Sequence, residues 1–338
     1  MITYETLAAR PAAFASLCGF TLAEFEALYQ DFAAAYAKDR AASLTRTGKP
    51  RKRAGGGGTP FSHDGRTRLL MALVFLRVYP TYEVLAFFFS LHKANAQRGV
   101  VDVLATLEAH TVFVCERPAA ERKKLRSVQA VMDAFPDVMD AFPDVRLVMD
   151  AKEQRIQRPG GSDESGNSRQ KPFYSGKKKT HTLKTQVAVA PDGAFQAVGQ
   201  SVPGSVHDLT LLRRSDLLHR LEKSEGIMLD KGYDGLQGFD PKQPDKNGPP
   251  HPCYLPHKAR RGQPLTAQQT AENAHLSKCR IVVEHSLAQM PQFQVLAQVF
   301  RHDRARHSGL TRIVAGLVNR RIAKRPLKTY PIKTYPAA

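Results

Sequence analysis

Two short apolar runs that each end in an aspartate constrain the fold of this chain more than any other feature. They are RLVMD (146–150) and GIMLD (226–230). Short apolar runs of this kind are typical of strands that are buried on both faces of a sheet. Between them, THTLKTQVAVA and AFQAVGQSV flank a Pro-Asp-Gly turn and predict a β-hairpin over 180–202. These patterns predict strands that follow one another at intervals, as in a mixed sheet.

Helical signals accompany these strands. Ser205 and Asp208 have the spacing of a capping box and predict a helix that begins at Ser205. Thr266 predicts the start of a later helix that reaches about Met290 and contains Glu284. Strands that alternate with helices in this way predict an α/β domain.

The first part of the chain differs, because its apolar residues recur at helical spacing. Residues 1–43 are predicted to be helical, and Thr21 is the predicted cap of the main helix. A basic stretch rich in glycine and proline, 44–60, predicts a flexible linker. Within 61–130, a long helix, a short helix capped by Thr81, a tight break and a polar-faced helix follow one another. That order is the layout of an all-α helix-turn-helix region.

The last of these helices begins with side chains that can read base edges or hold phosphates. A plain three-helix bundle produces the same pattern and remains the alternative. The predicted DNA contacts on this helix are Lys93, Asn95, Gln97 and Arg98.

The sequence MDAFPDV occurs twice in succession, at 132–138 and 139–145, just before the first apolar run. Its aspartates flank prolines, which are excluded from central strands. The segment 131–145 is therefore predicted to be an irregular lead-in, and Asp150 is the aspartate of this stretch that follows an uninterrupted strand-like run. The aspartates of the lead-in are Asp133, Asp137, Asp140 and Asp144.

The charge balance favours a nucleic-acid partner. Fifty Lys and Arg residues against 31 Asp and Glu give a net charge of +19, and a polyanion is the usual partner of such a protein. The cysteines form no CxxC pair, so a disulfide or zinc framework is not expected. The apolar runs are too short to span a bilayer, and the N-terminus lacks a signal-peptide pattern. We expect a cytoplasmic protein with no membrane partner.

Two aspartates at strand ends and a glutamate in a later helix suggest metal-dependent chemistry. The three candidates are Asp150, Asp230 and Glu284. Magnesium takes few protein ligands, mostly carboxylates, and completes its shell with water and phosphate. Phosphodiester cleavage can use two such ions about 3.5–4 Å apart. Carboxylates from two strands and a helix could hold this pair of ions.

Several dense motifs surround these carboxylates. In chain order they are MDAKEQRIQRP, YSGKKKTHTLKTQ, VPGSVHDLTLL, LDKGYDG, PHKARRG, RIVVEHSL and FRHDRARHSGLTRIVAGLVNRR, over about 146–321. In this order they resemble the DDE transposases of the insertion-sequence-five type, which are related to the Harbinger group. The resemblance implies an RNase H-like fold in which Asp150, Asp230 and Glu284 are both the catalytic and the metal-binding residues. It also implies two Mg²⁺ ions, which Mn²⁺ can replace.

The same resemblance implies a bacterial, nucleoid-associated enzyme that cuts and joins double-stranded DNA. Its substrates would be the terminal inverted repeats of a mobile element and the target DNA, and it would act as a homodimer on paired ends. We predict a catalytic domain over 146–325 and a basic tail over 326–338. Two features depart from the family pattern. Lys152 replaces a small hydroxyl residue, and the segment 286–293 contains Pro291 and lacks the basic residues that usually follow the glutamate.

Two other functions remain open at this point. A transposase descendant could bind specific DNA sequences without cutting them, and an RNA-processing nuclease could share the fold. The helix-turn-helix pattern favours duplex DNA, whose base edges are readable in the major groove.

Alternatives also remain for individual residues. Asp208 is an alternative second carboxylate, for which helix capping is the other explanation, and Glu284 could pair with Arg280 one helical turn away. Basic residues near the carboxylates are predicted to hold DNA phosphates. A solvated surface position is the alternative for each except Lys231, which could instead shape the turn after Asp230. The basic residues are Arg155, Arg158, Lys177, Lys178, Lys179, Lys184 and Lys231.

Overall fold

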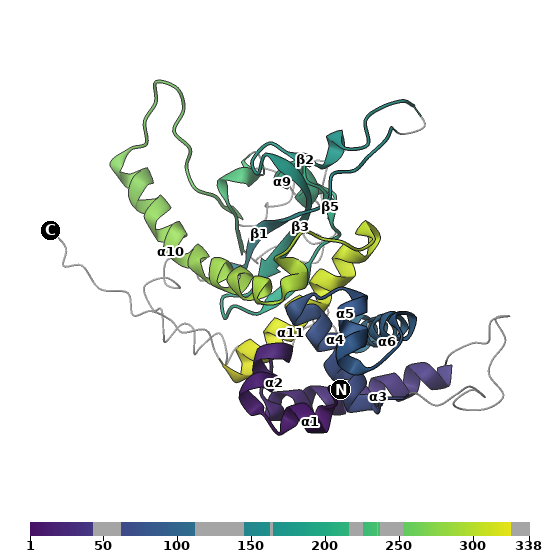
Figure 1. Cartoon of the computed structure of the whole chain (residues 1–338). Coiled ribbons are helices and arrows are strands. Elements are labelled where there is room, and N and C mark those ends of the chain that lie inside the picture. Colours follow the sequence, from purple (N-terminus) through teal and green to yellow (C-terminus); the bar gives the residue numbers. More distant parts are fainter. Residues whose placement is uncertain are drawn as a thin grey trace. The chain divides into compact units, whose positions relative to one another are not determined.

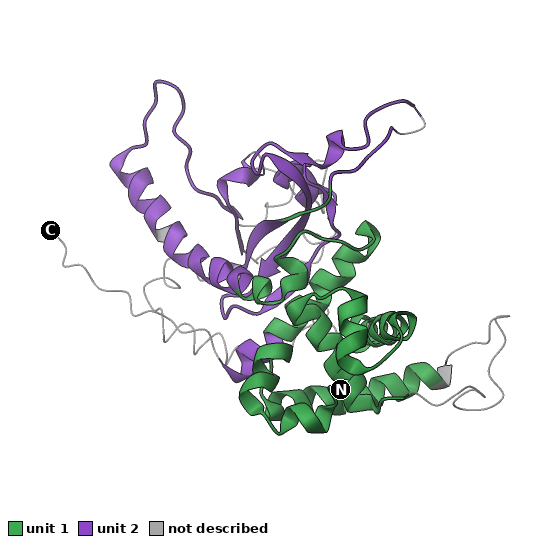
Figure 2. Cartoon of the chain, in the orientation of Figure 1, with its two compact units in different colours: residues 1–113, 154–157, 289–318 green, residues 114–153, 158–288, 319–338 purple. Residues whose placement is uncertain are grey.

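The computed structural model describes residues 1–42, 62–111, 145–162, 165–215, 226–234, 236 and 253–325. The predicted linker, the lead-in up to residue 144 and the basic tail lie outside these ranges. In the described ranges, no helix is both long and apolar enough to cross a membrane. The chain forms two compact units (Figure 2). Unit 1 comprises 1–113, 154–157 and 289–318, and unit 2 comprises 114–153, 158–288 and 319–338.

Unit 1 begins with the helices that the N-terminal pattern predicts. Thr21 and Glu24 exchange hydrogen bonds in a capping box, since the Glu24 N–H donates to Thr21 Oγ1 and the Thr21 N–H donates to the Glu24 carboxylate. Phe25, Leu28 and Phe32 are buried, which confirms the predicted apolar face. The helices are α1 (Tyr4–Ala8), α2 (Pro11–Cys18), α3 (Leu22–Ala42), α4 (Gly65–Val78), α5 (Tyr82–Phe89) and α6 (Lys93–Thr106).

Helices α4, α5 and α6 follow the predicted order of a long, a short and a polar-faced helix. Thr81 caps α5, as predicted, by accepting a hydrogen bond from the N–H of Val84 (3.3 Å). The break after α5 is made by Ser90, whose φ of +51° is in the region that favours glycine. The three helices pack on one another, and their assignment as a helix-turn-helix stays a prediction.

Unit 1 also contains residues from later in the chain. The Gln154 side chain donates a hydrogen bond to the carbonyl of Val295 (2.8 Å), and its Oε1 lies 2.9 Å from His307 Nε2. All three residues are thereby tied together although they are far apart in sequence. Unit 1 therefore depends on the C-terminal part of the chain as well as on the N-terminal helices.

Unit 2 is built around a mixed seven-stranded sheet (Figure 1). The strand order is β2-β3-β1-β6-β7, and β4 and β5 also pair with β3. Strands β1, β6 and β7 are parallel, whereas β3 is antiparallel to β2, β4 and β5. The strands are β1 (Val145–Arg155), β2 (Tyr174–Ser175), β3 (Thr180–Val189), β4 (Phe195–Val198), β5 (Val202–Pro203), β6 (Gly226–Met228) and β7 (Cys253–Tyr254).

The first strand is longer than its apolar run predicts. We expect it to end at Asp150, but β1 continues to Arg155, because Glu153 and Gln154 find polar partners inside the protein. The predicted hairpin is confirmed, since Val187 of β3 lies opposite Val198 of β4.

Two helices complete the described part of unit 2. Helix α9 (Asp208–Arg213) starts later than predicted: its N-cap is His207, and the Ser205 N–H donates to the carbonyl of Pro172 instead. The predicted capping box was therefore wrong. Helix α10 (Ala267–Gln289) starts as predicted after Thr266. From there the chain enters unit 1, and the last helix, α11 (His307–Lys324), begins in that unit.

Candidate active site

Asp150 lies within β1, directly after the fully buried Met149. Its Oδ1 accepts a hydrogen bond from the backbone N–H of Ala151 (2.7 Å). Burial raises the pKa of Asp150 above its ordinary value, and the charge of Asp230 adds to this increase. The Ala151 N–H and the charge of Arg280 lower the pKa and offset part of the increase. The Asp150 carboxylate is thus held where water solvates its charge poorly.

Asp230 follows β6 and lies level with Asp150. Strands β1 and β6 are parallel, and Val148 is the register partner of Met228. Two residues further along, the same register places Asp150 beside Asp230, and adjacent strands are about 4.8 Å apart. Asp230 Oδ1 accepts a hydrogen bond from the N–H of Lys231 (2.7 Å), which starts a 3-10 turn. The sheet therefore brings the two predicted aspartates together.

Arg280 of α10 faces this pair of aspartates. Its Nη1 lies 3.1 Å from Asp230 Oδ1, and the guanidinium side chain is largely buried. Its Nε is also buried and has no hydrogen-bond partner within the described ranges. One guanidinium therefore faces two carboxylates, and it is bonded to one of them.

Glu284 lies one helical turn after Arg280 on α10, and its side chain is exposed. Among the residues that the structure describes, Glu284 has no ion pair, and Arg280 pairs with Asp230 in its place. The neighbouring Val283 is fully buried, so α10 packs through Val283 while Glu284 faces solvent. The structure brings two of the three predicted carboxylates together and leaves the third apart.

The Asp150–Asp230 pair fits a divalent cation. Magnesium needs only one or two protein carboxylates when phosphate and water fill its other positions. Burial disfavours the negative charge of Asp150, and a metal ion would stabilise that charge in addition to Arg280. Across the described ranges, no three His, Cys, Asp or Glu side chains are grouped closely enough to hold a metal ion. The fit is therefore to the aspartate pair, without Glu284.

A second charge cluster involves the other face of β1. Glu153 points away from the face of Asp150, because side chains alternate along a strand. Its carboxylate accepts a hydrogen bond from the Thr182 hydroxyl (2.8 Å) and lies 3.7 Å from Lys184 Nζ. Lys184 Nζ is also 2.8 Å from Asp208 Oδ1 and donates to the carbonyl of Val206. We name Glu153, Thr182, Lys184 and Asp208 the lysine cluster.

This cluster changes the interpretation of two predicted residues. Lys184 is predicted to touch DNA phosphates, but it is buried and its ammonium is engaged by the lysine cluster. Asp208 is neither a helix cap nor part of the aspartate pair, because it forms the ion pair with Lys184. A Cβ at Gly232 would lie 2.8 Å from Asp208 Oδ2, so a larger residue in this turn would displace the Asp208 carboxylate.

The turn after Asp230 is anchored in the core by Tyr233. Its ring is fully buried and its hydroxyl accepts a hydrogen bond from Gln186 Nε2 (3.0 Å). Burial raises the pKa of Tyr233 well above its ordinary value. Tyr233 therefore shapes the turn, while the neighbouring Lys231 is exposed.

The other predicted DNA contacts are exposed. Strands β2 and β3 form a hairpin whose tip carries the three lysines of the GKKK sequence. The positive charge of Lys177 lowers the pKa of Asp150. On α6, Lys93 pairs with Glu83 at 3.5 Å, and both side chains are largely exposed. The exposed residues are Lys93, Asn95, Gln97 and Arg98 of α6, Arg155, Arg158, Lys177, Lys178, Lys179 and Lys231.

Comparison with known families agrees with this geometry. A family model described as DDE superfamily endonuclease matches residues 149–319. The chain belongs to this family. The DDE endonuclease match begins one residue before Asp150 and includes Asp230, Arg280 and Glu284. Members of this superfamily generally use divalent metals.

Two curated proteins that are similar to this chain are named as transposases. A probable transposase for insertion sequence element IS702 from Microchaete diplosiphon is 29% identical over 182 residues, covering 52% of this chain and 57% of the relative. A transposase for insertion sequence element IS1106 from Neisseria meningitidis serogroup B is 35% identical over 113 residues, covering 33% of this chain and 35% of the relative. The chain thus spans little more than half of one relative and about a third of the other. No solved structure matches the chain significantly.

Sequence reasoning missed the partner of one group near the site and noted another group only as a departure from the family pattern. Helical spacing offers Glu284 as an alternative partner of Arg280, and only the folded chain brings Arg280 to Asp230. Lys152 follows Asp150 on the same face of β1, and its Nζ is buried with no hydrogen-bond partner in the described part of the chain. Burial lowers the pKa of Lys152 to about 8. Its place beside Asp150 in the sequence is the signal that singles it out.

Proposed function

We propose that this chain is a DNA transposase that binds the terminal inverted repeats of an insertion sequence and carries out metal-dependent strand cleavage and strand transfer. The observation that carries the proposal is the level placement of Asp150 and Asp230 on parallel strands, with burial raising the pKa of Asp150. The family match over 149–319 and the transposase names of the relatives support the same function.

Asp150 and Asp230 would hold Mg²⁺ or Mn²⁺ through their carboxylate oxygens, and Glu284 would complete the site once DNA is bound. When bound, the ions would lower the pKa of a water molecule and neutralise charge on the phosphodiester. Arg280 would share the Asp230 carboxylate with the ion, because its Nη1 lies 3.1 Å from Asp230 Oδ1. The lysines at the β2–β3 tip and the exposed side chains of α6 would contact DNA, and a homodimer would hold the paired ends.

A catalytically silent DNA-binding descendant is the second candidate. Glu284 is exposed and apart from the aspartates, and Lys152 adds a buried ammonium on the face of Asp150. Both features would weaken a metal site of three carboxylates, while the basic surface would still bind DNA.

The deciding experiment is a cleavage assay on linear DNA that carries the element's terminal repeats, with Mg²⁺, Mn²⁺ or EDTA. We expect metal-dependent cuts at the repeat boundary that disappear in Asp230→Asn. Repeat-specific binding without a cut under either metal would instead establish the silent descendant.

A further inference from the structure

The segment between β7 and α10 contains the PHKARRG sequence and has no role in the site described above. We name residues 255–266 the basic strap. It leaves the sheet from β7, which is parallel to β6, and the Leu229 N–H donates a hydrogen bond to the carbonyl of Tyr254 just before the strap (3.0 Å). Since β6 and β7 run in the same direction, the strap starts at the sheet edge where Asp230 lies. Ligands of parallel sheets generally bind outside this carboxyl edge.

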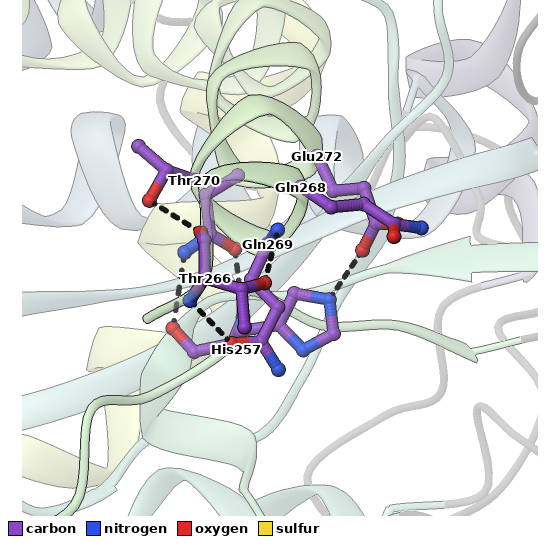
Figure 3. Close-up of polar contacts among 7 residues, drawn as sticks. His257, Thr266, Gln268, Gln269, Thr270 and Glu272 are labelled. Atoms are coloured by element: carbon purple, nitrogen blue, oxygen red, sulfur yellow. Dashed lines mark hydrogen bonds and ion pairs between the residues drawn. The ribbon is translucent and has the colours of Figure 1, made fainter. Parts of the chain in front are cut away.

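The strap is tied to α10 by a paired set of polar contacts (Figure 3). The His257 backbone N–H donates to Asn273 Oδ1 (2.7 Å), and Asn273 Nδ2 donates back to the His257 carbonyl (3.1 Å). The His257 imidazole lies 2.6 Å from a Glu272 carboxylate oxygen, and this contact lowers the pKa of Glu272. These contacts fix the backbone of the strap without using any of its arginines.

The end of the strap next to α10 is fixed as well. Thr266 Oγ1 accepts a hydrogen bond from the N–H of Gln269 (3.1 Å), and the Thr266 N–H donates to Gln269 Oε1 (3.0 Å). This reciprocal capping box joins the strap to the first turn of the helix. The strap is therefore ordered at its start, at His257 and at its end.

The tip of the strap presents cations from this ordered backbone. Arg260 and Gln263 exchange two backbone hydrogen bonds (3.1 and 2.9 Å), and Gly262 has a φ of +76° in the turn. Arg260 and Arg261 are exposed, and neither forms an ion pair with any residue that the structure describes. Lys258 lies 3.2 Å from Asp234, four residues after Asp230 in the chain. Lys258 thus lies beside the turn that follows Asp230, and Arg260 and Arg261 come within three residues of Lys258 in the chain.

We propose that the basic strap is a binding site for the phosphate backbone of the DNA strand that reaches Asp150 and Asp230, with Arg260 and Arg261 as the phosphate contacts. The proposal rests on the proposed function, because it takes DNA as the partner. Arginine binds phosphate oxygens through two parallel N–H donors. A backbone that is ordered before binding loses little conformational entropy when DNA arrives. Such contacts position the DNA and carry no sequence information directly.

The test is the salt dependence of DNA binding by the full chain, measured by fluorescence anisotropy with a labelled duplex. Each lost phosphate contact on B-DNA reduces the slope of log K against log salt by about 0.9. We expect Arg260→Ala combined with Arg261→Ala to reduce the slope by about 1.8 and to weaken binding at every salt concentration. The matched control is Arg10→Ala combined with Lys38→Ala, which removes the same charge from two exposed positions of unit 1 and should leave the slope unchanged.

The outcomes separate this proposal from the function on which it rests. If the unsubstituted chain binds no DNA, the proposed function fails and the role of the strap fails with it. If the unsubstituted chain binds with a steep salt dependence and the double strap variant has the same slope, the strap proposal alone is overturned. Equal losses in the strap variant and the control would also overturn it, because net charge would then explain the effect.

A second variant tests the contribution of the ordered backbone. Asn273→Ala removes both contacts to the His257 peptide and keeps every cation of the strap. We expect weaker DNA binding than in the unsubstituted chain, with a smaller loss than in the double strap variant, and an unchanged urea midpoint would show that the fold is intact. DNA binding by Asn273→Ala equal to that of the unsubstituted chain would contradict the ordered strap.

Discussion

The two faces of β1 carry two charge clusters that differ in how their charged groups are paired. On one face, Lys184 lies among a carboxylate at 2.8 Å, a second carboxylate at 3.7 Å and a backbone carbonyl, and a hydroxyl supports Glu153. On the other face, Arg280 bonds to Asp230 and to no other carboxylate of the described residues, and Asp150 accepts a hydrogen bond from its neighbouring peptide. In the first cluster a lysine already pairs with both carboxylates, whereas the second has capacity for another cation.

The difference teaches how a structural charge cluster can be told from a functional one. A buried ion pair with added hydrogen bonds is stable as it stands, and the loss of one partner leaves an uncompensated charge. A partly buried carboxylate whose pKa is raised is less stable in its charged form, and functional sites are enriched in such groups. We therefore interpret the Asp150 face as a candidate binding site and the lysine cluster as a structural support.

The largest expected effect comes from removing the centre of the lysine cluster. Lys184→Met keeps the length of the side chain but leaves Glu153 and Asp208 without a cation, so we expect the free energy of unfolding to fall by about 3–5 kcal/mol. Urea denaturation would measure it. Lys178→Met, at an exposed position of the β2–β3 tip, is the control and should change stability by less than about 0.5 kcal/mol. A loss for Lys184→Met as small as that of the control would contradict the role of the cluster.

The next effect concerns the backbone that supports the lysine cluster. A Cβ at Gly204 would lie 1.9 Å from Thr182 Oγ1 and 3.0 Å from the Thr182 carbonyl. Gly204→Ala therefore forces β3 and its neighbour to move, and we expect a loss of about 1–3 kcal/mol in urea denaturation. Gly160→Ala, where an added Cβ meets nothing within 4 Å, should not lower stability. Equal stability of the two variants would show that the contact at Gly204 relaxes freely.

A smaller and opposite effect is expected on the Asp150 face. Because burial raises the pKa of Asp150, the folded metal-free protein is favoured below the unfolded pKa of about 3.9 and loses this advantage as pH rises through the folded pKa. Asp150→Asn does not ionise, so at neutral pH it should be more stable than the unsubstituted chain by about 1 kcal/mol. Stability measured from acidic to neutral pH in EDTA should show the gain growing with pH. A destabilised Asp150→Asn at neutral pH would contradict the poorly solvated carboxylate.

An effect of similar size is expected on metal binding when Arg280 is replaced. Its guanidinium occupies an oxygen of Asp230 that a metal ion would use, so Arg280→Met should bind Mn²⁺ more tightly by about 1 kcal/mol, or about fivefold. Lys278→Met removes an exposed cation from the same helix and is the matched control. Identical Mn²⁺ affinities in the two variants would mean that Arg280 does not compete with the ion.

Local signals in the sequence predict much of the fold. The helix starts at Thr21, Thr81 and Thr266 and the hairpin of β3 and β4 depend on residues close together in the chain, and the structure confirms them. The extension of β1 beyond Asp150 could not be predicted, because its polar residues are stabilised by partners that are distant in sequence.

The candidate site shows the same limit. Parallel strands that end at Asp150 and Asp230 predict that these residues meet, and the register agrees with this. Helical spacing offers Glu284 as an alternative partner of Arg280, but in the folded chain Arg280 forms its ion pair with Asp230. Lys184 looks like a surface cation in the sequence, and its burial follows from the arrangement of β1, β3 and α9. Spacing predicts neighbours within an element, whereas charge partners between elements require the tertiary structure.

The central claim is that Asp150 and Asp230 together hold a divalent cation. The most direct measurement is calorimetric titration of the metal-free chain with Mn²⁺, compared with Asp150→Asn, Asp230→Asn and Glu284→Gln. We predict that either aspartate variant abolishes measurable binding, because each removes one of two carboxylates, and that Glu284→Gln retains it, because Glu284 lies apart from the pair. Mn²⁺ affinity that is unchanged in both aspartate variants would contradict the account.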